Sequence, residues 1–568
     1  MWPRYPDAPQ LRYTTDWRLV PRPSEDMHGY SHGHSEESRA GHTGHGPRRG
    51  ARVHMTAPYL YSRQFLAGPR VVAVPALSVG EQFCERLYVA RHPALSSSVA
   101  SAGATRILCL GDVLDPRSPH LDNQEIVAAL AHGVREFSQF EEATSHLGGR
   151  WLMFVQIADT LRLYPDAVGT KSAFHVVTRD GEVWAASQPR LFVDALGVGV
   201  DQALWERYLS APYADSWPAH VTPYVGTRQL LPNHYLDVAT GKAHRFWPTG
   251  PLPHRRLEEA AARIADGLYR SMSALVARGT VALALTGGLD SRSVLACAGD
   301  LRPRVKLFTI VDINSYWHDV WLPRKVARLF GQPWKPIHTR RYDAAVGETF
   351  RRNVAGMWWD ISDHRLYTFE KVGARFIVLG LCSEVARCFH YKDGTAPSVV
   401  TVDLLTKLSR YPGNPVAIEA LSEWLAGVPA EMNIHPLDLF FWENRLGNWA
   451  SMLYTGIDTV ADTTNPYNCR ELLEIGLGVD LEYRKEPYRL HRRICEIGAP
   501  ESLTLPINSI WPERVWDSVA RWIPWRVRNR ILTVMMRRLG FQWPRPLSPT
   551  PKQVLSDLAP DDRARLLL

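Results

Sequence analysis

A short apolar run that leads directly into a glycine-rich loop is the feature that most constrains this chain. Residues 281–291 read VALALTGGLDS, and residues 292–298 continue as RSVLACA. A brief run of small apolar residues ahead of glycines is typical of a strand buried in a parallel sheet. The segment that follows suits the first turns of a helix, so we expect the loop at a strand-to-helix junction.

The loop at this junction, residues 286–291, carries the groups that an anion needs. Free backbone N–H groups and the positive end of the helix dipole favour negative charge at a helix N-terminus. Two glycines let the backbone approach phosphates closely, and Thr286 and Ser291 add hydroxyl donors. Asp290 would repel a bare phosphate, so it suits the loop if it holds a magnesium ion that the phosphates share. The alternative is an ordinary structural turn, and we favour nucleotide binding.

A second strand end supplies a candidate partner for Asp290. Residues 375–379 (RFIVL) are an apolar run that continues into residues 380–384 (GLCSE). Ligands of doubly wound sheets bind beyond the carboxyl ends of such strands, so we expect the Glu384 carboxylate to meet Asp290 across the magnesium ion. Asp312 follows a third such strand and is expected to line the same crevice.

The chain of 568 residues is long enough for two or three domains. Residues 1–55 are rich in Pro, Gly, Ser, Arg and His and are expected to form a disordered tail that binds metal ions loosely at most. Residues 56–250 predict an α+β domain with much antiparallel sheet. Residues 251–515 alternate helices and strands, which predicts a doubly wound α/β domain that becomes mainly helical beyond about residue 400. Residues 516–568 predict a basic, Trp-rich helix and tail.

Hydrophobic periodicity gives the individual elements of these two domains. In the first domain we expect a helix at 123–137 and strands at 71–79, 106–114, 150–158, 161–165, 173–178 and 182–187. In the second we expect helices at 257–277, 292–298 and 321–330 and strands at 281–285, 305–311 and 375–379.

Charge and cysteine content narrow the function less than the motifs do. The formal net charge of +8 permits nucleic acid, an anionic membrane or an acidic substrate and selects none of them. Seven scattered cysteines without a CxxC pair favour free thiols in a reducing cytoplasm. We find neither an apolar run of about 20 residues nor a secretory signal. The basic stretch 516–538 is expected to pack on the body of the protein, with peripheral contact to a membrane or a partner protein as the alternative.

On these motifs the chain resembles the class-B, glutamine-hydrolysing asparagine synthetase family over most of residues 59–512. The loop at 286–291 is similar to the SGGxDS pyrophosphatase loop, with Thr in place of the first Ser. It is not the GxxxxGK[ST] nucleotide-binding loop, because it has no lysine. The further similar segments are LGGR (147–150), YPDAVG (164–169) and LPNHY (231–235) in the amidotransferase half, and residues 308–311, 379–384 and 465–467 in the synthetase half.

The resemblance implies an Ntn-type amidotransferase-like α+β domain followed by an α/β doubly wound ATP-pyrophosphatase domain, adenine nucleotide α-hydrolase-like, with a helical C-terminal part. It implies ATP and Mg²⁺ as cofactors, with Asp290 and Glu384 as metal ligands. By the same resemblance, Leu285, Ile310 and Gly380 contact the nucleotide through the backbone, and Thr286, Gly287, Gly288, Leu289 and Ser291 lie around the pyrophosphate.

The first half departs from the family at the residue that matters most. The family's glutaminase uses an N-terminal cysteine whose own amino group is the base, whereas this chain starts Met1-Trp2, and a start at Met55 would expose Thr56. Cys84 is internal and has no free amine, so we do not expect glutamine hydrolysis. The half is then a scaffold or a substrate platform, similar to the β-lactam synthetases and lasso-peptide cyclases, whose amine comes from the substrate.

The second half departs at its charged residues. Leu381 stands at a family glutamate, Glu384 replaces a shorter aspartate, and the family's lysine falls near Asn508. We therefore assign the charge of the leaving pyrophosphate to Arg292, ahead of Arg492 and Arg493. Candidate bases are His318-Asp319 and Asp360, Asp363 and His364, although such clusters are more often loop caps and ion pairs. Residues 440–449 (FFWENRLGNW) are expected in the core, with Glu443 and Arg445 as the residues that could face a substrate.

The function expected from the sequence is that of an ATP-dependent amide-forming ligase, an AMP-forming carbon–nitrogen ligase. Its carboxylate is a small molecule or a precursor peptide, and its amine is free ammonia, a small molecule or the substrate's own amino group. Macrolactam closure of a lasso-type peptide is the most specific expectation, with biosynthetic partner proteins. The alternatives are ammonia-dependent amidation of a small molecule and a catalytically decayed scaffold. RNA modification is not favoured, because no RNA-binding module is recognisable.

Overall fold

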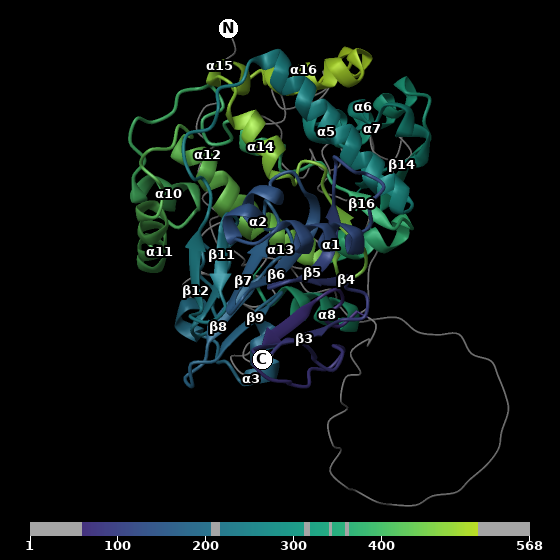
Figure 1. Cartoon of the computed structure of the whole chain (residues 1–568). Helices are drawn as coiled ribbons and strands as arrows, with labels where there is room; N and C mark the ends of the chain where they lie inside the picture. The colour runs from purple at the N-terminus through teal and green to yellow at the C-terminus, as the bar shows by residue number, and fades with distance from the viewer. Residues whose placement is uncertain (1–58, 206–215, 312–317, 340–343, 358–362, 509–568) are drawn as a thin grey trace, which may run out of the picture. The chain divides into compact units, whose positions relative to one another are not determined.

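The structure is a computed structural model of the chain that describes residues 59–205, 216–311, 318–339, 344–357 and 363–508 (Figure 1). The described residues all belong to one compact unit. The predictions for residues 1–55, for the stretch 516–568 and for Asp312 and Asp360 lie outside these residues.

The first half contains two six-stranded antiparallel sheets, with strand orders β10-β8-β9-β1-β3-β2 and β12-β11-β7-β6-β5-β4. The first sheet comprises β1 (Phe65–Gly68), β2 (Glu81–Cys84), β3 (Leu87–Arg91), β8 (Phe174–Val177), β9 (Val183–Ala186) and β10 (Thr227–Gln229). The second comprises β4 (Ser97–Ala102), β5 (Thr105–Leu114), β6 (Gly148–Ile157), β7 (Thr160–Pro165), β11 (His234–Asp237) and β12 (Lys242–Arg245).

Successive side chains of the long strands β5 and β6 point to opposite faces of the sheet, and this alternation explains how the layers of the first half stack. Leu108 and Phe154 point into the core between the two sheets, whereas Cys109 and Met153 point into a separate core beneath the helices. That outer layer contains α1 (Asn123–Gly133) and α2 (Phe137–Ala143), and α3 (Arg190–Leu196) follows β9. Both faces of β5 and β6 are apolar, so this sheet is covered on both sides.

The second half is built on a five-stranded sheet of order β15-β14-β13-β16-β17 in which every neighbouring pair is parallel. Its strands are β13 (Val281–Ala284), β14 (Val305–Val311), β15 (Trp334–His338), β16 (Phe376–Val378) and β17 (Thr463–Thr464). The chain adds strands in one direction from β13 to β15 and in the other direction from β16 to β17. This reversal confirms the predicted doubly wound topology and puts the switch point between β13 and β16.

Helices surround this sheet and fill the C-terminal region, as predicted (Figure 1). Those before residue 400 are α5 (Leu257–Arg278), α6 (Leu289–Cys297), α7 (His318–Leu329), α8 (Ala344–Val354) and α9 (Asp363–Thr368), with 3₁₀ turns η1 (Gly299–Arg304), η2 (Phe369–Val372) and η3 (Ser383–Ala386). Beyond residue 400 follow α10 (Val402–Leu408), α11 (Pro415–Ala426), α12 (Pro436–Phe440), the π-helix η4 (Phe441–Ala450), α13 (Ser451–Ile457), α14 (Arg470–Leu477), α15 (Leu481–Arg484), α16 (Arg489–Gly498) and the 3₁₀ turn η5 (Pro500–Thr504).

One continuous apolar core joins the two halves. It extends from Phe174 and Trp184 of the first sheet to Val281 and Val378 of the parallel sheet. The predicted domain boundary at residue 250 falls between β12 and α5, and Trp247 and Ala260 on its two sides both belong to this core. The halves therefore pack as one body. Residues at their interface contribute to the stability of both halves.

The structure corrects two predicted elements. Residues 71–79 do not form a strand, because Pro75 cannot donate to a ladder and Val79 is 80% exposed. The helix predicted at 123–137 ends at Gly133, and α2 begins separately at Phe137.

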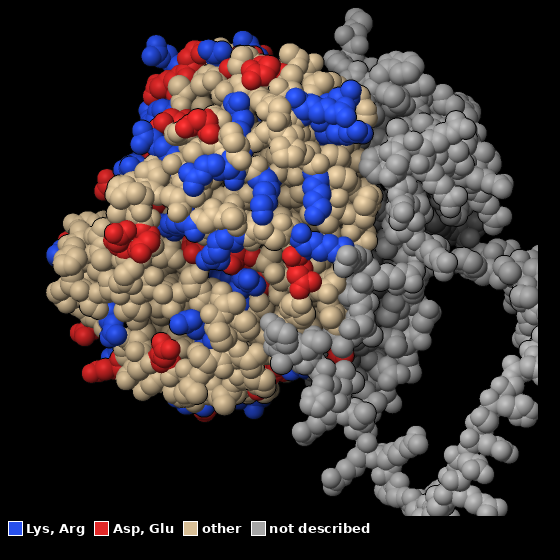
Figure 2. Space-filling model, turned by 90° about the vertical axis from the view of Figure 1, so that its right-hand side faces the viewer, with Lys and Arg blue, Asp and Glu red and all other residues tan. Residues whose placement is uncertain are grey.

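Surface charge does not select a partner. Figure 2 shows Lys and Arg side chains spread over one face with Asp and Glu side chains between them. Surface cations of the described residues form ion pairs, such as Arg270 with Asp266 and Arg493 with Glu258. All seven cysteines are free thiols. Among the described helices, none has both the length and the apolar content that crossing a bilayer requires.

Candidate functional site

The glycine loop lies at the switch point of the parallel sheet. It follows β13, and the segment 379–384 follows the neighbouring strand β16. The two loops touch: a Cβ atom added to Gly380 would lie 2.5 Å from the backbone nitrogen of Ser291. Any side chain at position 380 would therefore collide with the first turn of α6, and the two predicted segments form one site.

Hydroxyl groups hold the glycine loop in a tight turn. The Thr286 backbone N–H donates to the Ser291 hydroxyl at 3.0 Å, and the two hydroxyl oxygens lie 3.1 Å apart. Gly288 precedes the first turn of α6, which contains Asp290. The helix begins three residues earlier than the sequence predicts, so Asp290 and Ser291 belong to its N-terminal turn, where the backbone N–H groups are free for a ligand.

The structure brings the two predicted magnesium ligands together around Arg387. Arg387 Nη2 lies 2.9 Å and 2.8 Å from the two Asp290 carboxylate oxygens and 3.3 Å from Glu384 Oε1. Ser383 donates a further hydrogen bond to Asp290. Burial and the nearby Asp290 charge raise the pKa of Glu384 to about 7, against the opposing effect of Arg387.

These groups fit a divalent cation that phosphates share. Glu384 Oε2 is buried and has no hydrogen-bond partner in the described part of the chain, so a carboxylate oxygen remains for a ligand. Among the described residues no cluster of three or more His, Cys, Asp or Glu side chains could hold a metal alone. Mg²⁺ prefers one or two carboxylates together with phosphate oxygens and water, which is the set this site can supply.

The start of α7 covers the loop from the other side. Asp319 accepts a hydrogen bond of 2.8 Å from the Gly287 backbone N–H, an amide predicted to contact phosphate. A Cβ at Gly287 would lie 3.0 Å from the backbone oxygen of His318. Of the candidate bases, His318 and Asp319 therefore lie at the loop, whereas the side chains of Asp363 and His364 are outside the described residues.

Arg292, the cation predicted to meet the charge of pyrophosphate, contacts backbone carbonyl groups in the structure. Its buried guanidinium donates to the backbone oxygens of Gly287 at 3.2 Å, Ser502 at 3.2 Å, Leu505 at 2.9 Å and Pro506 at 2.8 Å. Burial lowers its pKa to about 10. The carbonyl groups of the segment after α16 need donors, and Arg292 supplies them, so its guanidinium ties that segment to the loop.

An Arg292→Lys variant is expected to lose about 1.5–3 kcal/mol of unfolding free energy, since one ammonium cannot serve four carbonyl oxygens arranged around a planar guanidinium. Urea denaturation measures the loss. The same substitution at Arg489, which is exposed, serves as the control. Equal stabilities of the two variants would contradict this role of Arg292.

Other residues of the predicted site have backbone groups that already form hydrogen bonds within the protein. Leu285 donates its N–H to Phe308 and accepts from the Thr309 hydroxyl at 2.6 Å, so its backbone is bonded within the sheet. Ile310 pairs with Ile337 in the β14–β15 ladder. Asn508 reaches the loop, because its N–H donates to the Gly287 oxygen at 3.0 Å.

The remaining cationic and aromatic candidates lie in structural contacts. Arg493 pairs with Glu258 and Glu496 at the surface, and Arg492 donates to the Pro487 oxygen. The segment 440–449 is mostly buried, as expected for core. Glu443 is fully buried and accepts from Asn233, Arg245 and Trp424. Arg445 stacks on the Trp449 ring with 4.4 Å to its centroid.

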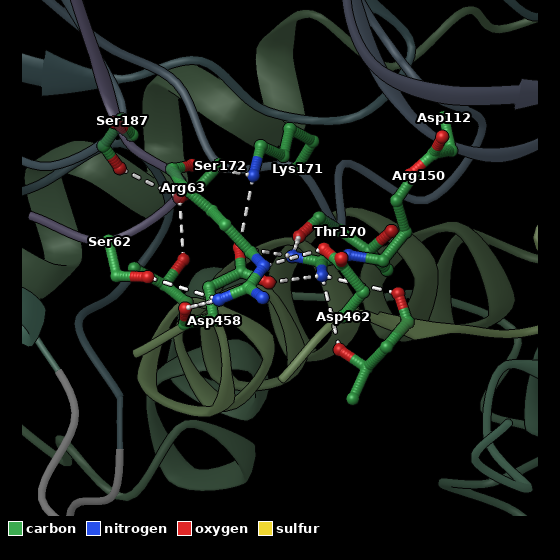
Figure 3. Close-up of polar contacts among 12 residues, drawn as sticks. Ser62, Arg63, Asp112, Arg150, Thr170, Lys171, Ser172, Ser187, Asp458 and Asp462 are labelled. Carbon is green, nitrogen blue, oxygen red and sulfur yellow. Dashed lines mark hydrogen bonds and ion pairs between the residues drawn. The ribbon is translucent and has the colours of Figure 1, made fainter. Parts of the chain in front are cut away.

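A second buried ionic cluster joins the two halves (Figure 3). Arg150 of β6 donates to both Asp458 carboxylate oxygens at 2.7 Å and 3.1 Å, and Lys171 donates to one of them at 3.0 Å. Arg63 pairs with Asp462 at 2.8 Å. The motif residue Asp166 is buried and accepts N–H groups of the turn that carries Lys171.

No protein-family model and no curated protein matches this chain. Among solved structures, it is similar to the glutamine phosphoribosylpyrophosphate (PRPP) amidotransferase from B. subtilis complexed with ADP and GMP, with 12% identity, 58% of this chain and 70% of that chain covered, and a TM-score of 0.21. It is also similar to the structure of the allosteric regulatory enzyme of purine biosynthesis, with 12% identity, coverage of 51% and 63%, and a TM-score of 0.21. At this level of similarity, function has to come from the geometry of the site.

Proposed function

We propose that this chain is an ATP-dependent amide-forming ligase. A carboxylate attacks the α-phosphorus of ATP, pyrophosphate leaves, and an amine then displaces AMP from the acyl-adenylate. The observation that carries the proposal is the meeting of Asp290 and Glu384, from two neighbouring parallel strands, beside a glycine loop at a helix N-terminus. This is where doubly wound sheets bind their ligands.

The chain's own residues divide the binding of ATP between them. The N–H groups in the first turn of α6, which have no acceptor within the helix, attract the phosphates. Asp290 and Glu384 hold the divalent cation, whose charge lowers the barrier for departure of pyrophosphate when it is bound. Gly380 fixes the second loop against the first. Most of the catalysis expected here is positioning and charge neutralisation.

The amine is expected to come from outside the first half. Cys84 lies on β2 in the interior of the sequence and lacks the free amine that a glutaminase nucleophile of this type needs. Free ammonia, a small amine and the substrate's own amino group all satisfy the chemistry, and a precursor peptide that supplies both groups would be closed to a macrolactam.

A decayed scaffold protein is the second candidate, and one observation favours it. Asp319 and Arg387 occupy the groups that a phosphate and a cation would take. The ligase and the scaffold differ in whether Asp319 and Arg387 give up these internal contacts when a nucleotide is offered.

Magnesium-dependent ATP–pyrophosphate exchange tests the proposal, with pools of carboxylates and peptides as acyl donors. Exchange in the wild-type chain and its loss in Asp290→Ala are expected, because this variant removes one of two metal ligands. Asp403→Ala, on the exposed side of α10, is the matched control. If calorimetry detects no ATP binding, the ligase proposal is wrong and the scaffold candidate replaces it.

A further inference from the structure

The site needs a cation toward the phosphates beyond the metal. Arg292 is committed to four carbonyl oxygens, and Asn508 is neutral. Leaving pyrophosphate carries several negative charges, and enzymes of phosphoryl chemistry meet such charge with Arg or Lys as well as with magnesium. Arg387 is the described cation that contacts both predicted metal ligands.

Arg387 is held in place but not saturated. It is 9% exposed, and its guanidinium lies 5.5 Å from the centre of the Tyr488 ring, at the start of α16. Its contacts with Asp290 and Glu384 use Nη2, whereas its Nε is buried and has no hydrogen-bond partner in the described part of the chain. A buried N–H without a partner is costly, so a ligand acceptor that completes it would be favoured.

The unpaired groups are complementary to a metal–phosphate unit. Among the described residues, the buried acceptor Glu384 Oε2 has no donor and the buried donor Arg387 Nε has no acceptor. They belong to side chains that touch at 3.3 Å. A cation satisfies the first and a phosphate oxygen the second, so both atoms can be completed by the same bound ligand.

We propose that Arg387 is a nucleotide-binding residue that neutralises the phosphates and the departing pyrophosphate. Without ligand, its guanidinium is the counter-charge of Asp290 and Glu384. When a divalent cation binds these carboxylates, the guanidinium turns its N–H donors to the phosphate oxygens that share the cation. The inference rests on the proposed function, because it gives Arg387 a role at the same site.

An Arg387→Gln variant is expected to change two affinities in opposite directions. Mn²⁺ alone, measured by electron paramagnetic resonance, should bind about tenfold more tightly, because the competing internal cation is gone. Magnesium pyrophosphate and magnesium ATP, measured by calorimetry, should bind about tenfold more weakly, because a charged donor to the phosphates is lost. Arg489→Gln is the matched control, since Arg489 stacks on Tyr483 at 4.8 Å without touching a carboxylate of the site.

The outcomes separate this inference from the proposed function. If the wild-type chain binds magnesium ATP and Arg387→Gln binds it equally well, Arg387 has no phosphate role and the ligase proposal stands. If the variant loses Mn²⁺ and nucleotide together and its melting temperature falls, Arg387 is structural and the inference is wrong. Arg387→Lys distinguishes this case from the expected one, because it keeps a cation and should retain most of the nucleotide affinity. If the wild-type chain binds no ATP, the proposed function itself fails.

Discussion

An Asp458→Ala variant is expected to unfold with a free energy about 3–5 kcal/mol lower than that of the wild-type chain. The substitution leaves Arg150 and Lys171 buried without their shared counter-charge. Both cations come from the first half, whereas Asp458 follows α13 in the second. Loss of this carboxylate therefore weakens the packing between the halves and the shared core, and urea denaturation measures the effect.

The stability that Asp458 contributes is expected to decrease as the pH falls. Burial alone would raise the pKa of Asp458, but Arg150 and Lys171 hold it below its ordinary value. A carboxyl group whose pKa is depressed by folding contributes stability above its unfolded pKa, and this contribution disappears as the pH falls through the folded pKa. The difference in stability between wild type and Asp458→Ala should therefore be complete near pH 7 and shrink below about pH 4.

Two further variants separate the effect of the buried cluster from the effect of removing any carboxylate. Asp403 pairs with Lys407 on the exposed surface of α10, and Asp403→Ala should cost less than about 0.5 kcal/mol. Adding Lys171→Met to Asp458→Ala should recover part of the stability, because one uncompensated buried charge is removed. Equal losses in Asp458→Ala and Asp403→Ala would show that the buried cluster does not hold the halves together.

The parallel sheet was predictable from sequence because its strands are locally distinctive. β14 occupies residues 305–311, the range that the apolar run predicts, and β13 and β16 fall within their predicted segments. The short strands β2 and β4 do not show this signal. β2 (EQFC) has two exposed residues and β4 has none fully buried, so the apolar alternation that marks a half-buried strand is absent.

The contact between the two candidate segments was predictable because it depends on their positions at the ends of neighbouring strands. Asp290 and Glu384 each follow a strand of one sheet, and parallel strands bring their carboxyl ends to the same edge. The partners of the site arginines carry no such signal. Arg292 contacts carbonyls more than 200 residues away in sequence, and no local pattern encodes that contact. Arg387 lies three residues after Glu384, a spacing that brings side chains together on a helical turn and could have indicated the contact.

A Gly380→Ala variant is expected to lower the rate of ATP–pyrophosphate exchange about a hundredfold and the stability by about 1–3 kcal/mol. The new Cβ would lie 2.5 Å from the backbone nitrogen and 2.8 Å from the Cβ of Ser291, so the two loops must separate. The atoms in the way belong to backbone and to a fully buried residue, which cannot swing aside as a flexible side chain would. A shift of about 1 Å at the start of α6 moves Asp290 relative to Glu384, and positioning is the main catalytic contribution expected of this site.

Gly250→Ala separates this steric effect from the general effect of replacing glycine, because a Cβ at position 250 meets no atom within 4 Å. It should leave exchange unchanged and alter stability by less than about 0.5 kcal/mol. A Gly380→Ala variant that exchanges pyrophosphate as fast as Gly250→Ala would mean that the segment after β16 need not lie against α6 for activity. In that case the carboxylate of Glu384 would have no fixed place beside Asp290, and the metal would depend on Asp290 and the phosphates alone. A smaller stability loss accompanied by the full loss of exchange would instead show that the loops separate without unfolding. The loss of activity would then come from the changed position of the Asp290 and Glu384 carboxylates relative to each other.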